Sequence, residues 1–474
     1  MEKMKFLTLL FFILSSFAVI TKAQVQSLNL GEAIEIALEN NSEIKIAVMN
    51  VKKADAAVSE AFGYALPSLD FSASFSHFLK KPKMSFPDFE SLLTNATYSI
   101  LFDENVIPRD ESKFRPVQNI LQSFVQTNNY ETSLQLTQTL FSSAVFRGIG
   151  ASEIYFNLSK EDLKNKVSET VLNVQKAFYG VLLTKELLTI TEESFQNAQK
   201  NLETVKAMFE QGLVSDFDKL QAEVQVENLR PVVSQMRNTL EDSKNALKIV
   251  LGLNQQAEID VKGDFKFDKM QKFVEEDIIE QAMQSNYAIK TFELKAQVDE
   301  AFIDLDRAEF WPNIAAFGNY TYAGTSDEWD FQNYSSLTVG LSFSINLFSG
   351  GRTKSRIEQS TLTYLQTDEQ LRQLKDIIKS QVKSKLLEIK RVTDLLEAQE
   401  RNVSLAQRAY DIAIVKYKEG TATQLEVQNA ELALKQAKTN LLQSQHSYLI
   451  TKFELEQLLG LTSEAYINSV RAED

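Results

Sequence analysis

An internal duplication of long heptad patterns is the feature that most constrains the fold of this chain. In the first half, apolar residues recur every seven positions, and the same spacing returns 208 residues further on. The two matching series are Val174, Val181, Leu188, Phe195, Leu202 and Phe209, and Val382, Ile389, Leu396, Val403, Tyr410 and Tyr417. A seam sustained over this length is typical of a coiled coil. We therefore expect two very long helices that pack along their length.

A second, shorter seam follows each long one after a glycine. Its members are Val226, Val233, Leu240 and Leu247 in the first half, and Leu434, Leu441, Tyr448 and Leu455 in the second. A reversal of the chain needs positive φ, which glycine adopts without strain. Each half is therefore predicted to contain two antiparallel helices, joined at Gly212 or at Gly420.

Four other stretches alternate apolar and polar residues, as strands do: 68–77, 130–141, 313–324 and 334–348. In the last of them, large apolar residues alternate with small polar ones. A strand of a soluble sandwich would show the same pattern, and the length also suits the ~10 residues of a tilted membrane-crossing strand. The alternation leaves both interpretations open. The long helical pattern that follows Gly350 and Gly351 favours membrane strands attached to coiled helices.

A shorter helical pattern precedes each pair of strands, at 28–62 in the first half. Its repeat lies 245 residues further on, where Ile34, Ala37, Asn41, Ile44 and Pro67 match Ile279, Ala282, Asn286, Ile289 and Pro312. Because this offset exceeds the later one of 208, the first half carries 37 extra residues between its strands. They fall within 78–129, which we predict as a long polar loop. Long loops on one side and short turns on the other suit a membrane barrel.

These patterns give the predicted organisation of the chain. A first repeat spans 24–254, a linker spans 255–272, a second repeat spans 273–461, and a tail spans 462–474. The predicted fold class is mainly α with membrane β.

Residues 1–23 have the features of a secretory signal peptide, with Lys3 and Lys5 before an apolar core and Ala23 at the cleavage site. The alternative is a single membrane helix, but the core from Phe6 to Ile20 is shorter than the ~20 residues of a span. No later apolar run is long enough to span as a helix. The chain has no Cys, so neither disulfides nor a lipidated thiol can stabilise or anchor it. Membrane attachment is expected from the strands.

The composition excludes several functional classes. With 50 basic and 64 acidic residues the net charge is −14, which disfavours nucleic acid as a partner. The only histidines are His77 and His446, so thiolate and His-rich metal sites are excluded. The sequence contains no phosphate loop, dinucleotide fingerprint or nucleophile elbow. We expect no catalytic residues, no metal and no cofactor, and the chain is not predicted to be an enzyme.

The two helix-hairpin tips are polar, duplicated and remote. They comprise FEQGLVSDFDKLQAE from Phe209 and YKEGTATQLEVQNAE from Tyr417. An ordinary turn would also explain their glycines. However, at ~1.5 Å per residue the helices place these turns roughly 85 Å from the strands. A remote and duplicated tip suggests a docking or gating end.

The duplicated order of helix, two strands and two helices, the proline before each first strand and the tips GLVSDFD and GTATQLE together resemble the TolC family of outer-membrane efflux channels. The resemblance covers nearly the whole mature chain. It implies a homotrimer whose twelve strands form one barrel in outer-membrane lipid, continued by a helical tunnel across the periplasm. It also implies a periplasmic adaptor protein and an inner-membrane transporter as partners.

The resemblance also implies site residues. The tips that would meet the adaptor hold Gly212, Leu213, Val214, Gly420, Thr421 and Ala422. The acidic residues near the periplasmic mouth would be Asp218 and Glu426, each six positions after a tip glycine. Asn429 stands where relatives close to the founding member have an aspartate, and Ala422 stands where they have a basic residue.

The implied function is the exit duct of a tripartite efflux or type I secretion system, which passes small molecules or proteins across the periplasm and outer membrane. The alternative is an exported structural or adhesive coiled-coil protein that opens no pore.

Overall fold

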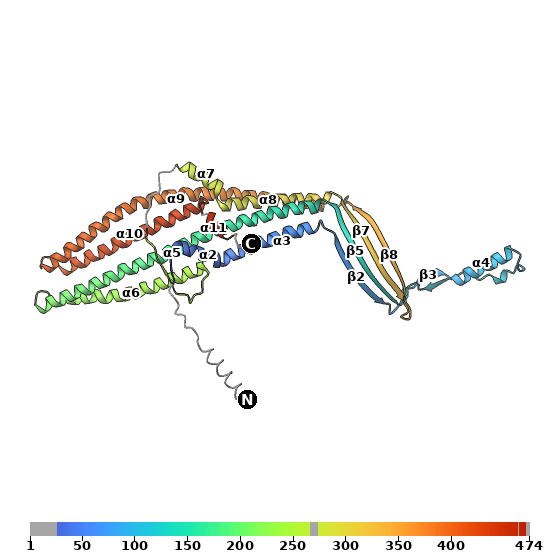
Figure 1. Cartoon of the computed structure of the whole chain (residues 1–474), viewed down its shortest axis with the longest axis horizontal. Helices are drawn as coiled ribbons and strands as arrows, with labels where there is room; N and C mark the ends of the chain where they lie inside the picture. Colours follow the sequence, from blue (N-terminus) through green and yellow to red (C-terminus); the bar gives the residue numbers. More distant parts are fainter. Residues whose placement is uncertain (1–25, 266–273, 463, 471–474) are drawn as a thin grey trace, which may run out of the picture. The chain divides into compact units, whose positions relative to one another are not determined.

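The computed structural model describes residues 26–265, 274–462 and 464–470 (Figure 1). The predicted signal peptide and part of the predicted linker lie outside these residues. The chain divides into two compact units. One is helical and contains the residues up to 58, 151–302 and those from 358 onward, and the other contains the main sheet in 59–150 and 303–357.

Two long helical hairpins dominate the helical unit. The first joins α5 (Ser143–Glu210) to α6 (Asp216–Leu251), and the second joins α9 (Arg352–Lys418) to α10 (Gln424–Leu458). The heptad seams are buried along much of their length, with Val174, Val181 and Val382 fully enclosed. This confirms the two predicted hairpins. Within the described part of the chain, no helix combines the length and the apolar character that crossing a bilayer would require.

The shorter helices are broken where one continuous helix was predicted. The pattern over 28–62 forms α2 (Leu30–Asn40) and α3 (Ser42–Gly63), and its repeat forms α7 (Glu275–Ser285) and α8 (Tyr287–Arg307). Both breaks fall at an asparagine with extended backbone, Asn41 or Asn286. Their side-chain amides donate to the carbonyl oxygens of Val250 (2.8 Å) and Leu458 (3.0 Å) near the ends of α6 and α10. The prediction of one helix was therefore wrong, because these tertiary acceptors favour the break.

The Leu-Gly-Leu sequences end α6 and α10 against the same breaks. Gly252 and Gly460 have positive φ, 69° and 65°. A Cβ at either glycine would lie within 3 Å of the carbonyl oxygen of Asn40 or Ser285. Here glycine is required both for the turn and for the close approach of another backbone.

Small elements complete the helical unit. The strands β1 (Gln26–Leu28) and β6 (Ile259–Val261) pair in parallel, and β6 lies in the predicted linker. The short helix α11 (Glu464–Ser469), within the predicted tail, contacts α2 and buries Ile467 in the core of the first repeat.

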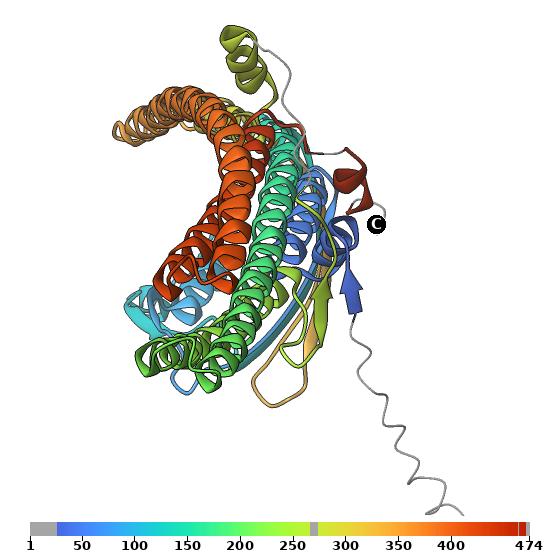
Figure 2. The same cartoon turned by 90° about the vertical axis from the view of Figure 1, so that its left-hand side faces the viewer.

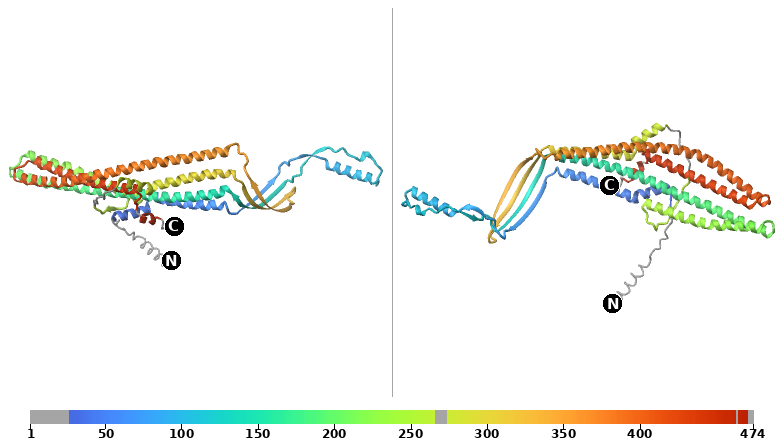
Figure 3. Two further views of the ribbon diagram at one scale, coloured as in Figure 1. Left: turned by 90° about the horizontal axis from the view of Figure 1, so that it is seen from above. Right: turned by 180° about the vertical axis from the view of Figure 1, so that it is seen from behind.

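The sheet unit holds four antiparallel strands in the order β2, β5, β7, β8 (Figure 3). Their bounds are Ser68–His77, Asn128–Ser142, Asn313–Ser326 and Gln332–Ser344. The last strand ends at Ser344, before the end predicted at Phe348, and the turn beyond it uses Gly350 and Gly351 at positive φ. Within the described residues, β2 and β8 are the two edges of this sheet, and each has a neighbour on one side only.

The strand register gives the sheet one apolar and one polar face. The apolar face carries Leu69, Phe71, Phe75, Leu134, Leu136, Tyr320, Tyr322, Leu337, Val339, Leu341 and Phe343. The polar face carries Asp70, Ser72, Ser74, Glu131, Ser133, Gln135, Asn319, Thr321, Ser336, Thr338 and Ser342. The apolar side chains are uncovered in the single chain, with Phe71 71% and Val339 77% exposed. A sheet this apolar on an uncovered face is suited to contact with lipid.

The segment predicted as a long polar loop, 78–129, is a folded insertion. It contains β3 (Met84–Pro87) paired with β4 (Asn119–Gln122), and α4 (Phe89–Asp103) followed by a short 3₁₀ turn (Glu111–Lys113). Its core is aromatic: Phe86 contacts Phe89 and Phe124, while Phe102 contacts Tyr98 and Phe114. The loop prediction was wrong because these scattered aromatic residues come together only in three dimensions.

Candidate functional site

The tips of the two helical hairpins form the candidate site, and each is built by the same local rules. At the end of α5, the amide of Gly212 donates to the carbonyl of Phe209 and that of Leu213 to the carbonyl of Met208, both at 2.9 Å. At the end of α9, Gly420 and Thr421 repeat these bonds to Tyr417 (3.0 Å) and Lys416 (2.9 Å). Gly212 and Gly420 have φ of 74° and 72°. Both helices therefore end in a Schellman motif that requires glycine.

The helices that leave the tips begin with capping boxes. Ser215 Oγ accepts from the amide of Asp218 (3.2 Å), and Asp218 Oδ2 accepts from the amide of Ser215 (3.0 Å). In the second hairpin, Thr423 Oγ1 accepts from the amide of Glu426 (3.3 Å), and Glu426 Oε2 accepts from the amide of Thr423 (3.0 Å). Each box satisfies two amides at a helix start, where a carboxylate is also favoured by the helix dipole.

The predicted mouth residues therefore have a local structural role. Asp218 and Glu426 lie six positions after their glycines because a two-residue turn and a capping box fill that interval. Glu426 and Asn429 are exposed, while Asp218 is partly buried.

The predicted docking residues differ in exposure. Gly212, Leu213, Gly420 and Thr421 are exposed, and Leu213 is 65% exposed. Val214 and Ala422 instead pack against the hydrophobic cluster between the hairpins, whose buried members are Val205, Ala222, Tyr410, Tyr417, Val427 and Leu434. The tips present further exposed apolar side chains that the sequence interpretation did not select, Phe217 (72%) and Leu425 (54%).

The two hairpins lie side by side, as Figure 2 shows with the tips toward the viewer. Polar contacts also join them. Gln221 Nε2 donates to Gln428 Oε1 (3.1 Å), and Ser194 Oγ donates to Glu431 Oε1 (3.2 Å). Farther from the tips, Lys438 forms an ion pair with Glu193 (3.0 Å). The tip is thus one structure made from both repeats.

Two polar side chains are buried at this seam: Tyr417, which lies in the predicted heptad seam, and Gln424, whose burial was not predicted. Gln424 is 1% exposed and Tyr417 is 5% exposed. Neither the amide of Gln424 nor the hydroxyl of Tyr417 has a hydrogen-bond partner among the described residues. Buried polar groups without partners weaken the packing around them. The only sequence signal for Gln424 was its position four residues after the tip glycine Gly420.

Burial also perturbs titratable groups at the seam. Burial raises the pKa of the Tyr417 phenol, and the Asp218 carboxylate of the other hairpin adds to this effect. Burial, with the nearby Glu431 and Asp411 carboxylates, raises the pKa of Tyr410 to about 12. Burial raises the pKa of Glu431 as well, against the opposing hydrogen bond from Ser194. Tyr410, Tyr417 and Glu431 thus have environments that favour their neutral forms.

The chain has an amphipathic sheet with open edges and an uncovered apolar face. It also has duplicated helical hairpins that meet at one tip. These features define an outer-membrane channel protein. The family model described as "Outer membrane efflux protein" matches residues 118–253 and 278–461, which is more than half of the chain. The chain belongs to this family, and its location is the outer membrane. The family description names export, not catalysis.

Individual relatives agree with this assignment. The chain is 24% identical over 350 residues to the outer membrane protein TolC of Salmonella enteritidis, covering 72% of this chain and 71% of that protein. It is 21% identical over 352 residues to the alkaline protease secretion protein AprF of Pseudomonas aeruginosa, covering 73% and 72%. Among solved structures, CusC matches with a TM-score of 0.70 at 19% identity, covering 94% of this chain and 96% of that chain.

Proposed function

We propose that three copies of this chain form one exit duct, with a twelve-stranded barrel in the outer membrane and a helical tunnel in the periplasm. The observation that carries this proposal is the pair of open edges, β2 and β8, on a four-stranded sheet whose apolar face is uncovered. In lipid, each unsatisfied backbone group costs several kcal/mol, so a spanning sheet closes into a barrel. Four strands are too few, because membrane barrels need at least ~8.

Closure of the sheet into a barrel decides which of its two faces meets lipid and which lines the pore. The face with Phe71, Leu134, Val339 and Leu341 contacts lipid, and the face with Ser72, Ser133, Thr321 and Ser336 lines the pore. Two copies would also reach eight strands. The choice of three rests on the likeness to TolC-type proteins and not on the strand count.

The tips at Gly212, Leu213, Val214, Gly420, Thr421 and Ala422 dock a periplasmic adaptor protein, which links the duct to an inner-membrane transporter. The exposure of Leu213 and the duplicated glycine turns support this role. The inward packing of Val214 and Ala422 makes them supports of the turn, while Leu213 and Thr421 supply the contact surface.

Asp218 and Glu426, with Asn429 nearby, form the periplasmic mouth. Three copies bring six carboxylates toward one opening, and a ring of carboxylates attracts cations. In this arrangement each carboxylate caps its own helix and also contributes charge to the mouth, since a capping box leaves lone pairs of the carboxylate available.

The duct passes small molecules or proteins that the inner-membrane transporter selects, as in efflux or type I secretion systems, and it catalyses no reaction. The family assignment disfavours the alternative of a structural or adhesive coiled coil without a pore.

The proposal is tested by the mass of the protein extracted from outer membranes in detergent. Three chains per particle are expected, with a band that migrates as the trimer on an unheated gel and as the single chain after heating. A particle of one or two chains would contradict the proposal, and so would recovery of the protein in the soluble periplasmic fraction.

A further inference from the structure

The helix α4 of the insertion has two opposite faces with the same spacing. The first face has residues at intervals of four, three and four: Ser91, Asn95, Tyr98 and Phe102. The second face has the same intervals two positions earlier, with Phe89, Leu93, Ala96 and Ile100. At 100° per residue, a shift of two residues places the two series on opposite sides of the helix.

The first face packs within the insertion. The Asn95 side chain exchanges two hydrogen bonds of 2.7 Å with the backbone of Arg115. Phe102 packs edge-on against Phe114, with ring centroids 5.7 Å apart, and Ser91 is buried. This face is therefore occupied by the segment that returns to the sheet.

The second face, called the outer stripe, consists of Phe89, Leu93, Ala96 and Ile100 and is exposed in the single chain, although the Phe89 ring also stacks on Phe86. Phe89 is 49% exposed, Leu93 63% and Ile100 64%. Its four residues carry no charge, and the next residue of the same face is Asp103, at the C-terminal end of α4. Isolated exposed apolar residues are ordinary, but a contiguous stripe of this kind marks a contact surface.

The chain before α4 places the outer stripe beyond the lipid. At the end of the sheet, Phe75 stacks on Trp329 and Tyr130 contacts Phe331, which forms the aromatic belt expected at a membrane interface. Three lysines, Lys80, Lys81 and Lys83, follow this belt and precede the insertion. Lipid is therefore a poor occupant for the stripe.

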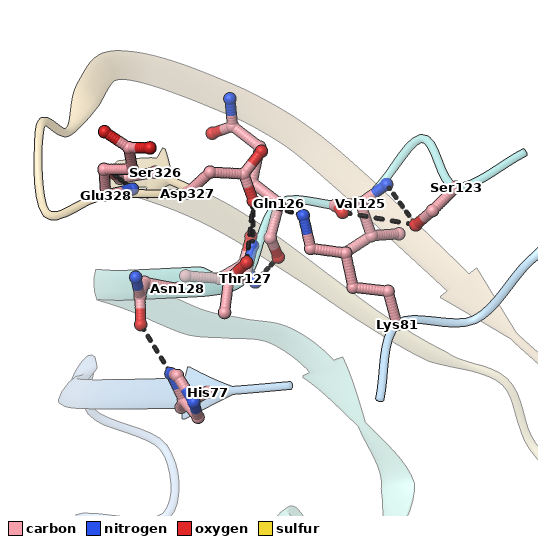
Figure 4. Close-up of polar contacts among 11 residues, drawn as sticks. His77, Lys81, Ser123, Val125, Gln126, Thr127, Asn128, Ser326, Asp327 and Glu328 are labelled. Carbon is pink, nitrogen blue, oxygen red and sulfur yellow. Dashed lines mark hydrogen bonds and ion pairs between the residues drawn. The ribbon is translucent and has the colours of Figure 1, made fainter. Parts of the chain in front are cut away.

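Polar contacts fasten the base of the insertion to the sheet, as Figure 4 shows. Asp327, in the turn between β7 and β8, forms an ion pair with Lys81 and accepts hydrogen bonds from the amide (2.9 Å) and hydroxyl (2.7 Å) of Thr127. His77 and Asn128 are hydrogen-bonded across β2 and β5 (2.7 Å). Both ends of the insertion are thus held at the rim of the sheet.

We propose that the outer stripes of the three copies pack against one another over the exit of the duct. The inference rests on the proposed trimer, which brings three insertions to one rim. A barrel of twelve strands has a radius of about 12 Å, from a strand spacing of ~4.8 Å and a tilt of ~40°. The 15 residues of α4 span about 22 Å at ~1.5 Å per residue, so each helix is long enough to reach its neighbours. The apolar residues of the stripe, from Phe89 to Ile100, are also complementary to the same residues of another copy.

The absence of cysteine from the chain makes disulfide cross-linking a clean test. Leu93→Cys and Ile100→Cys place single thiols on the outer stripe. Arg109→Cys is the matched control, because Arg109 is an exposed residue of the same insertion outside the stripe. In the detergent-extracted trimer, we expect mild oxidation to give several-fold more covalent dimer for the stripe variants than for the control. The stripe thiols should also be protected from a water-soluble maleimide on intact cells.

A charge variant tests whether the cross-link depends on the apolar character of the outer stripe. In an Ala96→Cys background, which leaves the aromatic core of the insertion intact, Leu93→Glu with Ile100→Glu should abolish the cross-link. The control pair Val106→Glu with Val117→Glu adds the same charge at exposed apolar positions outside the stripe and should leave the cross-link unchanged.

The outcomes separate this inference from the trimer itself. A trimer whose stripe thiols cross-link no better than Arg109→Cys overturns the inference alone. If those thiols are protected from maleimide without cross-linking, another occupant such as lipid covers the stripe, which also overturns it. A chain that is not trimeric overturns both proposals.

Discussion

Replacing the tip glycines tests whether the tips dock a partner. The double variant Gly212→Val with Gly420→Val forces a β-branched residue into the left-handed region, at a cost of ~1–2 kcal/mol per position. A Cβ at either position meets no atom within 4 Å. The strain of about 2–4 kcal/mol is therefore confined to two exposed turns, and we expect the trimer to assemble normally while efflux is largely lost.

The same fold provides a matched control. Gly252 and Gly460 have nearly the same φ, but a Cβ at either would lie within 3 Å of a backbone carbonyl in the neighbouring helix. Gly252→Val with Gly460→Val therefore adds a backbone clash to the same strain. We expect this second pair to reduce the yield of trimer, which the tip pair should not do.

The assay compares the two pairs in cells that lack the chromosomal copy of the gene. Trimer is measured on unheated gels of outer membranes, and efflux is measured as resistance to an exported compound. Wild-type efflux by the variant Gly212→Val with Gly420→Val would show that the tips are ordinary turns with no docking role. Equal loss of trimer in both pairs would refute the reasoning that the strain at the tips is local.

Three other perturbations have defined outcomes. Asp218→Asn with Glu426→Gln should weaken the cation preference of the pore in planar bilayers, and unchanged selectivity would assign the controlling charges elsewhere. Because burial raises the pKa of Glu431, the folded state loses stability as pH rises from the ordinary value of 4.5 through the raised one. Glu431→Gln should therefore unfold at a higher temperature than wild type at pH 7 but not at pH 4. Equal unfolding temperatures of the two proteins at pH 7 would refute this prediction. Hydrogen bonds from Lys81 and Thr127 lower the pKa of Asp327 from 3.8 to about 2. The stability that the ionised Asp327 carboxylate gives to the folded state is therefore present above pH 4 and lost as pH falls toward 2. Asp327→Asn should make the insertion more sensitive to trypsin at pH 7, while pepsin at pH 2 should cut the variant and the wild type alike. Equal trypsin sensitivity of the two at pH 7 would show that the contacts of Asp327 do not hold the insertion.

The long hairpins and the strands could be predicted because their signals are periodic and local. A heptad seam such as Val174 to Phe209 repeats many times, and the alternation in β8 needs no knowledge of distant residues. The duplication strengthened both predictions, since a chance pattern would not recur 208 residues later. The capping boxes of Ser215 with Asp218 and of Thr423 with Glu426 were not predicted, although both pairs have the three-residue spacing that such a box requires.

What could not be predicted depends on tertiary partners. Asn41 breaks a helix because its amide reaches the carbonyl of Val250, more than 200 residues away. The insertion folds because Phe102 meets Phe114 across a polar, proline-containing segment. Likewise, the burial of Gln424 arises only when two hairpins from different repeats pack together.

The central claim is that the open edges β2 and β8 pair between copies and close a ring of three. Cysteine pairs test it directly, with Ser72→Cys on β2 and Ser336→Cys, Thr338→Cys or Ser342→Cys on β8, all on the polar face. For at least one pair, oxidation of outer membranes should give covalent species of two and three chains and nothing larger, because the ring is complete at three. The absence of cross-links from every pair, or a ladder that continues beyond three chains, would contradict the account.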